Sequence, residues 1–339
     1  MNDEQQFIIE DPDTKKTETL TVKRFWIVPH LLVLAVIMVG LFSTLIIPKT
    51  TALLQPASSP LMSNQDTTVP ERNSVAVATL PEVALRASSV IVFDAATGQV
   101  LYEKNADEKL PLASITKLMT ALVAYEVVDD DTKVTVSERA AAEQSGGTLR
   151  AGEVFEIKAL ADFSLVSSFN SAAYTLADAV GRLLGSHDPQ TQFVVAMNIR
   201  ASELGLDSLE FFNATGLDIS SSQSGGYGTA RDVASLVNYI LNTHPAILSP
   251  TIKPTTRLYN SAGEYHDARN TNEILTDIPN VVGSKTGYTD LAGGNLVMAY
   301  NAGLDRPIII VVLNSTRSGR FTDVYNLYDA VRQSLASLE

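Results

Sequence analysis

Three short strings in this chain carry the residue types of an acyl-transfer site. They are Ser114-Ile115-Thr116-Lys117, Ser168-Phe169-Asn170 and Lys285-Thr286-Gly287, and each occurs once. A serine hydroxyl becomes a useful nucleophile only when a base lies beside it, and a cation fixed near it can hold an anionic part of the substrate. Together the strings therefore supply a nucleophile, candidate bases and an anion clamp.

The first string predicts a serine nucleophile with a lysine base. Apolar residues from Ile115 to Val123 recur at helical spacing, so Ser114 should open a helix and Lys117 should follow it on the same face. Lysine can act as a base near neutral pH only if its pKa is lowered. Burial, the positive helix N-terminus and a second cation, for which Lys285 is the candidate, would each lower it. The backbone N–H of Ser114 would lie where an oxyanion could be held.

The other two strings lie at the ends of predicted helices and of a predicted strand. Ser168 and Asn170 lie between two predicted helices, so Ser168 could pass a proton while Asn170 orients Lys117 or the substrate. The alternative is that they only cap the helix that begins at Ser171. Lys285 and Thr286 end a predicted strand and could bind a carboxylate, or could simply lead into a turn.

The order of elements predicts an α+β fold. Strands are expected at 89–94, 99–103, 256–259, 281–286, 295–299 and 307–313, and helices at 157–166, 171–184, 190–204, 229–241 and 321–335. We therefore expect one antiparallel sheet built from both ends of the domain and flanked by helices, with an inserted all-helical subdomain.

The N-terminal part predicts a membrane anchor. Residues 26–47 are almost entirely apolar and long enough to cross a bilayer, although a buried helix or a cleaved signal peptide is the alternative. More basic residues precede this segment than follow it closely, so residues 1–25 should be a cytoplasmic tail and the rest should lie outside the cell membrane. We predict that residues 48–81 form a flexible linker and that residues 82–339 form the catalytic domain.

Composition excludes several other functions. The chain has no cysteine, and its four histidines lack zinc-ligand spacing, so neither a metal nor another cofactor is expected. Its net charge of −13 disfavours a nucleic-acid partner.

Longer strings around these residues resemble a known family. LPLASITKLMTA, LVSSFNSAA, MNIRASELGL followed by FFNATGL, and VVGSKTGYTDLAGGNL are similar to the low-molecular-mass D-alanyl-D-alanine carboxypeptidases. These belong to the penicillin-binding proteins and serine β-lactamases, and the resemblance spans residues 85–335. It implies the β-lactamase/DD-peptidase-like fold, a peptidoglycan stem peptide as substrate and β-lactams as covalent inhibitors.

The resemblance also assigns roles. Ser114 would attack the carbonyl between the two terminal D-alanines, Lys117 would take its proton, Ser168 would relay a proton to the departing D-alanine, and Asn170 would position Lys117 and the substrate. The remaining candidates would bind substrate. Lys285 and Thr286 would bind the terminal carboxylate, with Arg269 and Arg320 as charges near it. Gly287 would lie along the substrate backbone, and the N–H groups of Tyr288 and Ser114 would bind the oxyanion.

Two positions depart from the family pattern, and three other functions compete. Phe169 stands where a small residue is usual and Ser171 where Asp is usual, so Phe169 is expected to narrow the groove or change which stem peptides fit. A D,D-endopeptidase that cuts cross-links and a non-catalytic peptidoglycan-binding protein are the alternatives. A β-lactamase is disfavoured because no E-x-x-L-N string is present, the nearest being Glu210-Phe-Phe-Asn213, and a long-lived penicilloyl adduct is expected.

Overall fold

The computed structural model describes residues 4–10, 17–23, 80–143, 149–185 and 187–337. Within these ranges, no helix has the length and apolar character needed to cross a bilayer. The predicted membrane segment, 26–47, and nearly all of the predicted linker lie outside the described residues. In the predicted tail, β1 (Glu4–Glu10) and β2 (Thr17–Lys23) pair as an antiparallel hairpin, which the sequence did not suggest.

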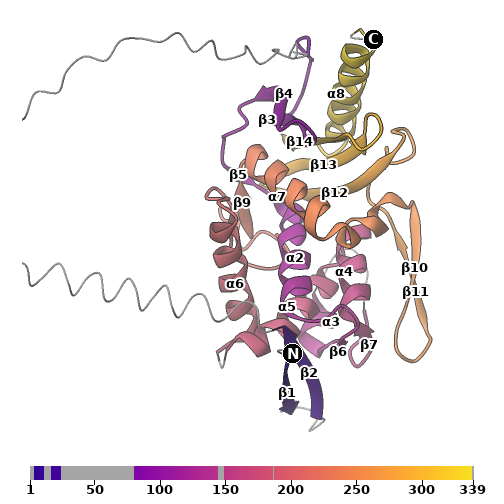
Figure 1. Ribbon diagram of the computed structural model, residues 1–339. Helices are drawn as coiled ribbons and strands as arrows, with labels where there is room; N and C mark the ends of the chain where they lie inside the picture. Colours follow the sequence, from indigo (N-terminus) through magenta and orange to yellow (C-terminus); the bar gives the residue numbers. More distant parts are fainter. Residues whose placement is uncertain (1–3, 11–16, 24–79, 144–148, 186, 338–339) are drawn as a thin grey trace, which may run out of the picture. The chain divides into compact units, whose positions relative to one another are not determined.

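A five-stranded antiparallel sheet joins the two ends of the globular part, as predicted (Figure 1). Its strands are β3 (Ser89–Asp94), β4 (Gln99–Lys104), β12 (Val281–Thr289), β13 (Gly293–Asn301) and β14 (Pro307–Ser315). The spatial order is β12-β13-β14-β3-β4, so the late strand β14 pairs with the early strand β3. Strand β12, which carries the Lys285 string, is therefore an edge strand.

Both faces of this sheet are covered, and strand β14 shows how. Its side chains alternate between two hydrophobic clusters, because successive residues of a strand point to opposite faces. Ile309 and Val311 face the cluster that includes α2 (Lys117–Val127) and α7 (Ala230–Thr243). Ile308 and Ile310 face the cluster formed with α8 (Gly319–Ala336). This two-sided burial explains why the strand is a continuous apolar run rather than an alternating one.

Helix α2 lies at the centre of the inserted region. It packs against α4 (Ile157–Val166), α5 (Asn170–Leu184) and α6 (Pro189–Glu203), which surround it in Figure 1. Every residue from Lys117 to Ala124 is buried, so this helix has no solvent face along its first two turns. A lysine at its start is consequently held inside the protein.

The prediction that the insertion is all helical is wrong. The region between β4 and β12 also contains β5 (Leu110–Pro111), β9 (Gly226–Gly228) and β8 (Glu210–Phe211) in one small sheet, and β6 (Lys133–Thr135) paired with β7 (Val154–Glu156). These strands have two or three residues each, which is too short for a periodic pattern. The strand predicted at 256–259 is present as β10 (Thr255–Tyr259), but it pairs with β11 (Tyr265–Arg269) in a separate hairpin and does not join the five-stranded sheet. The remaining helical pieces are α3 (Glu138–Ala142), η2 (Ala113–Thr116), η3 (Pro245–Ile247) and η4 (Ser249–Ile252).

Candidate active site

Ser114 lies on a strained turn rather than at the start of an α-helix. It belongs to the 3₁₀ turn η2, and α2 begins three residues later at Lys117. Ala113 has a φ of +47°, a conformation that costs about 1–3 kcal/mol for a residue with a side chain. A neighbouring turn fixes this geometry, because Gly216 approaches so closely that a Cβ there would overlap the Ala113 carbonyl. Strain of this kind often accompanies a functional site.

Lys117 is fully buried and points its amine at three oxygens. Its Nζ donates to Ser114 Oγ at 2.8 Å, to Asn170 Oδ1 at 2.8 Å and to the Thr215 carbonyl at 2.7 Å. None of these partners carries a negative charge, so no ion pair with them offsets the cost of burying an ammonium group. Burial accordingly lowers the pKa of Lys117 from 10.5 to about 7. The predicted pairing of hydroxyl and weakly basic amine is therefore present.

Lys285 forms the second half of the cluster. Its Nζ donates to Ser168 Oγ at 2.9 Å and to the Thr286 carbonyl at 2.8 Å. Burial lowers the pKa of Lys285 well below its ordinary value, and the nearby positive charges of Lys117 and Arg320 lower it further. The charge of Lys117 therefore acts on Lys285, whereas the predicted reverse effect, a lowering of the Lys117 pKa by Lys285, is absent because burial alone lowers the pKa of Lys117.

Ser168 does not serve as a helix cap. Helix α5 begins at Asn170, its N-cap residue is Phe169, and no side chain makes the capping bond. Ser168 has a φ of +61° and directs its hydroxyl to Lys285 instead. The capping alternative therefore does not describe this residue.

Phe169 does not line the groove, contrary to our expectation. Its side chain is only 8 % exposed and stacks on Phe163 with the ring centroids 5.4 Å apart and the planes 8° from parallel. The ring points into the core because Ser168 and Asn170, on either side of it, point toward the lysines. Ser171 is likewise fully buried. We therefore assign Phe169 a packing role.

Replacing Phe169 by Ala should destabilise the protein by about 3–4 kcal/mol, because the change leaves a cavity against Phe163. Urea denaturation followed by circular dichroism measures this loss. The ratio of rates on two different stem peptides should stay the same. If the ratio of rates on the two stem peptides changed while the unfolding midpoint did not, Phe169 would contact the substrate after all.

Gly287 permits strand β12 to approach the nucleophile. A Cβ at this position would lie 2.9 Å from the Leu112 carbonyl oxygen and 3.2 Å from the Ser114 nitrogen. Both neighbours are backbone atoms, which cannot move aside as a flexible side chain could. Strand β12 is an edge strand of the five-stranded sheet, so within that sheet it pairs with β13 alone.

Replacing Gly287 by Val should lower activity at least about a hundredfold, because a displacement of about 1 Å in an active site has that effect. Steady-state kinetics on a D-Ala-D-Ala peptide measures it. Gly303→Val is a suitable control, since a side chain there meets nothing within 4 Å and the backbone does not have a positive φ. If Gly303→Val and Gly287→Val had similar kinetics, the close approach would be irrelevant to function.

The predicted carboxylate end of the site gathers a hydroxyl pair and an arginine. Thr286 Oγ1 lies 2.6 Å from Thr271 Oγ1. Arg320 is 7 % exposed and donates to the Gly287 carbonyl at 2.6 Å, and burial lowers its pKa to about 10. Arg269 has an exposed side chain, and its carbonyl accepts a hydrogen bond from Ser167 at 2.9 Å. Of the two predicted arginines, only Arg320 has its side chain bound beside the Lys285 string.

Tyr288 lies beyond Gly287 at the mouth of the site. Its side chain is 43 % exposed, and the guanidinium of Arg317 lies 5.3 Å from the centre of its ring. Its exposed ring places this residue beside solvent, while its backbone continues the edge strand.

The turn that holds Lys117 was not predicted from the sequence. Asn213 Oδ1 accepts from the backbone N–H of Thr215 at 3.1 Å and of Gly216 at 2.7 Å, which fixes the Thr215 carbonyl for Lys117. The string FFNATGL was noticed as a family pattern but was given no role. A backbone carbonyl leaves no mark on residue type, so only the Asn and Gly that shape the turn could have indicated it.

Asp218 was also missed, and it ties that turn to the end of β12. Its carboxylate accepts from Thr289 Oγ1 at 3.0 Å and from the Leu291 N–H at 3.2 Å. The segment behind Lys117 is thereby connected to the segment that follows Tyr288.

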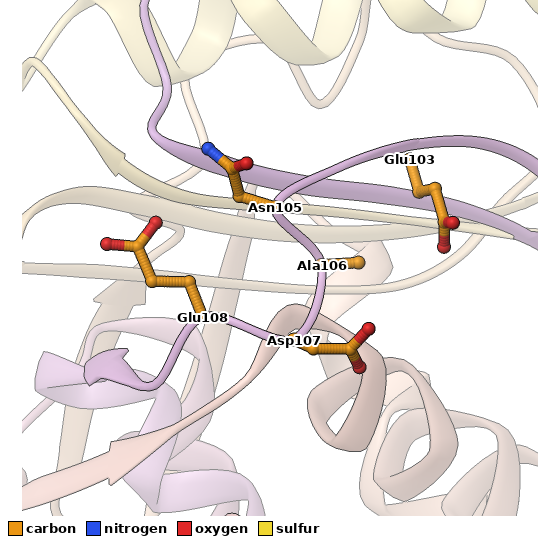
Figure 2. Close-up of a pocket in the computed structure, with 5 residues that line it drawn as sticks. All are labelled: Glu103, Asn105, Ala106, Asp107 and Glu108. Atoms are coloured by element: carbon orange, nitrogen blue, oxygen red, sulfur yellow. The ribbon is translucent and has the colours of Figure 1, made fainter.

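A surface hollow away from this cluster shares no residue with it. It is lined by Glu103, Asn105, Ala106, Asp107 and Glu108, and Figure 2 shows Glu103 and Asp107 on one side of the loop and Asn105 and Glu108 on the other. Arg231 binds both Glu103 and Asp107 at 2.7 Å, so these two carboxylates already have a cationic partner. The hollow is a solvated ion-pair region rather than part of the serine–lysine site.

Comparison with known proteins agrees with this geometry. Residues 74–317 match the family model described as D-alanyl-D-alanine carboxypeptidase. The chain is 33 % identical over 256 residues to the D-alanyl-D-alanine carboxypeptidase DacF of Bacillus subtilis, an alignment that covers 73 % of this chain and 62 % of that protein. It is 31 % identical over 253 residues to a D-alanyl-D-alanine endopeptidase of Escherichia coli, covering 72 % of this chain and 75 % of that protein. The chain thus spans about three fifths of the first relative's length.

Solved structures share the fold. A D-alanyl-D-alanine carboxypeptidase from Mycobacterium tuberculosis aligns with a TM-score of 0.65 and 26 % identity over 75 % of this chain and 93 % of that one. Penicillin-binding protein D2 from Listeria monocytogenes, in its cefotaxime-bound form, aligns with a TM-score of 0.63 and 29 % identity over 74 % of this chain and 98 % of that one. The chain belongs to the D-alanyl-D-alanine carboxypeptidase family of serine peptidases.

Proposed function

We propose that this chain is a serine-type D-Ala-D-Ala carboxypeptidase that removes the terminal D-alanine from peptidoglycan stem peptides. One observation carries the proposal: Lys117 Nζ lies 2.8 Å from Ser114 Oγ, and its pKa is about 7. A neutral amine at this distance can take the serine proton near neutral pH, which ordinary lysines cannot do.

The first chemical step joins Ser114 to the substrate. Ser114 Oγ attacks the carbonyl between the two D-alanines while its proton moves to Lys117 Nζ. The backbone N–H groups of Ser114 and Tyr288 hold the oxyanion that forms. Asn170 keeps the Lys117 amine in place through its 2.8 Å hydrogen bond.

The second step releases D-alanine. The C–N bond breaks, and the departing amine receives a proton from Lys117 through the hydroxyl of Ser168. Lys285, Thr286 and Arg320 form the cationic and hydroxyl-bearing end of the site, where the terminal carboxylate binds. Arg269, whose side chain is exposed, is the remaining candidate charge for binding this carboxylate. Water then attacks the acyl-enzyme and returns a proton to Ser114.

β-Lactams should acylate the same serine. A Listeria relative with this fold has been solved in its cefotaxime-bound and ampicillin-bound forms. Since the chain lacks the water-activating E-x-x-L-N string of class A β-lactamases, we propose that the penicilloyl adduct is long-lived.

Mass spectrometry of a defined pentapeptide stem tests the activity. The purified protein should remove one alanine and leave the tetrapeptide. An intact pentapeptide, together with a stable protein and normal penicillin labelling, would refute carboxypeptidase activity.

A D,D-endopeptidase is the second candidate. The alignments with the endopeptidases of Escherichia coli and Pseudomonas aeruginosa cover 75 % and 74 % of those proteins, more than the 62 % for DacF. Incubation with a cross-linked muropeptide dimer separates the two functions. Conversion of dimer to monomers, with little loss of alanine from pentapeptide, would favour the endopeptidase.

We further propose that residues 26–47 anchor the protein in the cell membrane, with residues 1–25 cytoplasmic and the catalytic domain outside. The apolar run and its flanking charges support this arrangement. An alkaline phosphatase fusion at residue 60 should be active in a bacterial host. An inactive fusion that is expressed at normal level would reverse the orientation.

A further inference from the structure

Thr271 contacts the Lys285-Thr286-Gly287 string from outside it. Its hydroxyl lies 2.6 Å from the hydroxyl of Thr286, which is 4 % exposed. The N–H of Thr271 donates to the carbonyl of Val166, the last residue of α4, at 3.2 Å. Thr271 is therefore fixed by the segment that leads to Ser168, while Thr286 belongs to the edge strand.

The number of protons on the Thr271 and Thr286 hydroxyls decides which of them donates to the other. A hydroxyl group has one proton to donate and can accept two hydrogen bonds. If Thr286 donates its proton to a substrate carboxylate, it has none left for Thr271. At a separation of 2.6 Å, the bond between the two hydroxyls then forms only with Thr271 as donor.

We propose that Thr271 is a positioning residue that makes the site specific for a free terminal carboxylate. It donates to Thr286 Oγ1 and so turns the Thr286 proton toward the substrate. This inference rests on the proposed function, in which Thr286 binds the carboxylate. Without the Thr271 proton, the Thr286 hydroxyl can rotate and present a lone pair to the anion, which repels it.

The hydroxyl pair also explains why the site should prefer a C-terminal carboxylate to a C-terminal amide. A carboxylate offers only acceptor oxygens, whereas a C-terminal amide offers an NH₂ donor as well. The guanidinium of Arg320 attracts the carboxylate but has no acceptor for an amide N–H, and a Thr286 proton aimed by Thr271 adds a directional donor. The loss of this donor should therefore harm the acid substrate more than the amide.

The test compares Thr271→Val, which keeps the shape and removes the hydroxyl, with Thr271→Ser, which keeps the hydroxyl. Substrates are a D-Ala-D-Ala peptide and the same peptide amidated at its C-terminus. Thr271→Val should lower kcat/KM for the acid about tenfold, chiefly through KM, and should reduce the acid-to-amide ratio about fivefold. Thr271→Ser should restore both values. Thr256→Val, a change on strand β10, is the matched control and should leave the ratio unchanged.

A double mutant settles whether Thr271 acts through Thr286. If it does, Thr271→Val should have no further effect in a Thr286→Val background. Additive losses, or equal losses on acid and amide peptides in a normally folded variant, would overturn the inference.

Acylation by benzylpenicillin and by its methyl ester gives the same comparison without peptide cleavage. If the wild-type protein cleaves the peptide or is acylated, but Thr271→Val leaves the acid-to-amide and acid-to-ester ratios unchanged, only the role of Thr271 is refuted. A wild-type protein that reacts with none of these compounds defeats the proposed function and this inference with it.

Discussion

Ser114→Ala should abolish both peptide turnover and labelling by fluorescent penicillin. Removal of a serine nucleophile costs on the order of a millionfold in kcat, because no other group can form the acyl-enzyme. A gel of purified protein incubated with fluorescent penicillin, together with release of D-alanine from a pentapeptide, measures the two losses. The unfolding midpoint should be close to that of the wild type.

Ser171→Ala is the matched control for this experiment. Ser171 is a fully buried serine on the adjacent helix α5, one residue after Asn170. It should label normally. Labelling of the Ser114→Ala variant would show that another residue is the nucleophile. An absence of labelling in the wild type would favour the non-catalytic peptidoglycan-binding alternative.

Lys117→Ala should slow acylation by about a hundredfold to ten-thousandfold, the usual contribution of a positioned general base. The loss follows from the removal of the amine that lies 2.8 Å from Ser114 Oγ. Stopped-flow measurement of penicillin acylation gives the rate directly. Lys158→Ala, which removes a half-exposed lysine paired with Asp162, should leave the rate unchanged.

The pH dependence of the wild type reports the same lysine. Burial lowers the pKa of Lys117 to about 7, so the amine is protonated and inactive as a base below this pH, and neutral above it. The acylation rate should therefore rise about tenfold per pH unit below 7 and level off above it. A rate that stays flat from pH 5.5 to 8.5, or that falls as pH rises through 7, would assign the base to another group.

The regular elements of the fold were predictable because their patterns are long. The helix expected at 157–166 is α4 and the strand expected at 89–94 is β3, both with the predicted bounds. Each buries an apolar surface that leaves a clear period in the sequence. The short strands of the insertion, such as β5 and β9, are fixed by tertiary pairing, so the sequence could not predict them.

The candidate site was predictable to the extent that it consists of side chains. Ser114, Lys117, Ser168, Asn170 and Lys285 were recognised by type and order. The structure joins them by hydrogen bonds in two groups, Lys117 with Ser114 and Asn170, and Lys285 with Ser168. The carbonyl of Thr215 was not predictable, because every residue has a carbonyl. The buried position of Phe169 also escaped prediction, since it depends on Phe163 and on the left-handed backbone at Ser168.

The position of β14 between β13 and β3 has a consequence for biosynthesis. Strand β3 leaves the ribosome long before its neighbour β14. A nascent chain that already contains Ser114 still lacks β12 with Lys285, and then lacks the strand that joins the two ends of the sheet. Covalent capture by penicillin would therefore mark only molecules in which β14 has been made and the sheet has formed.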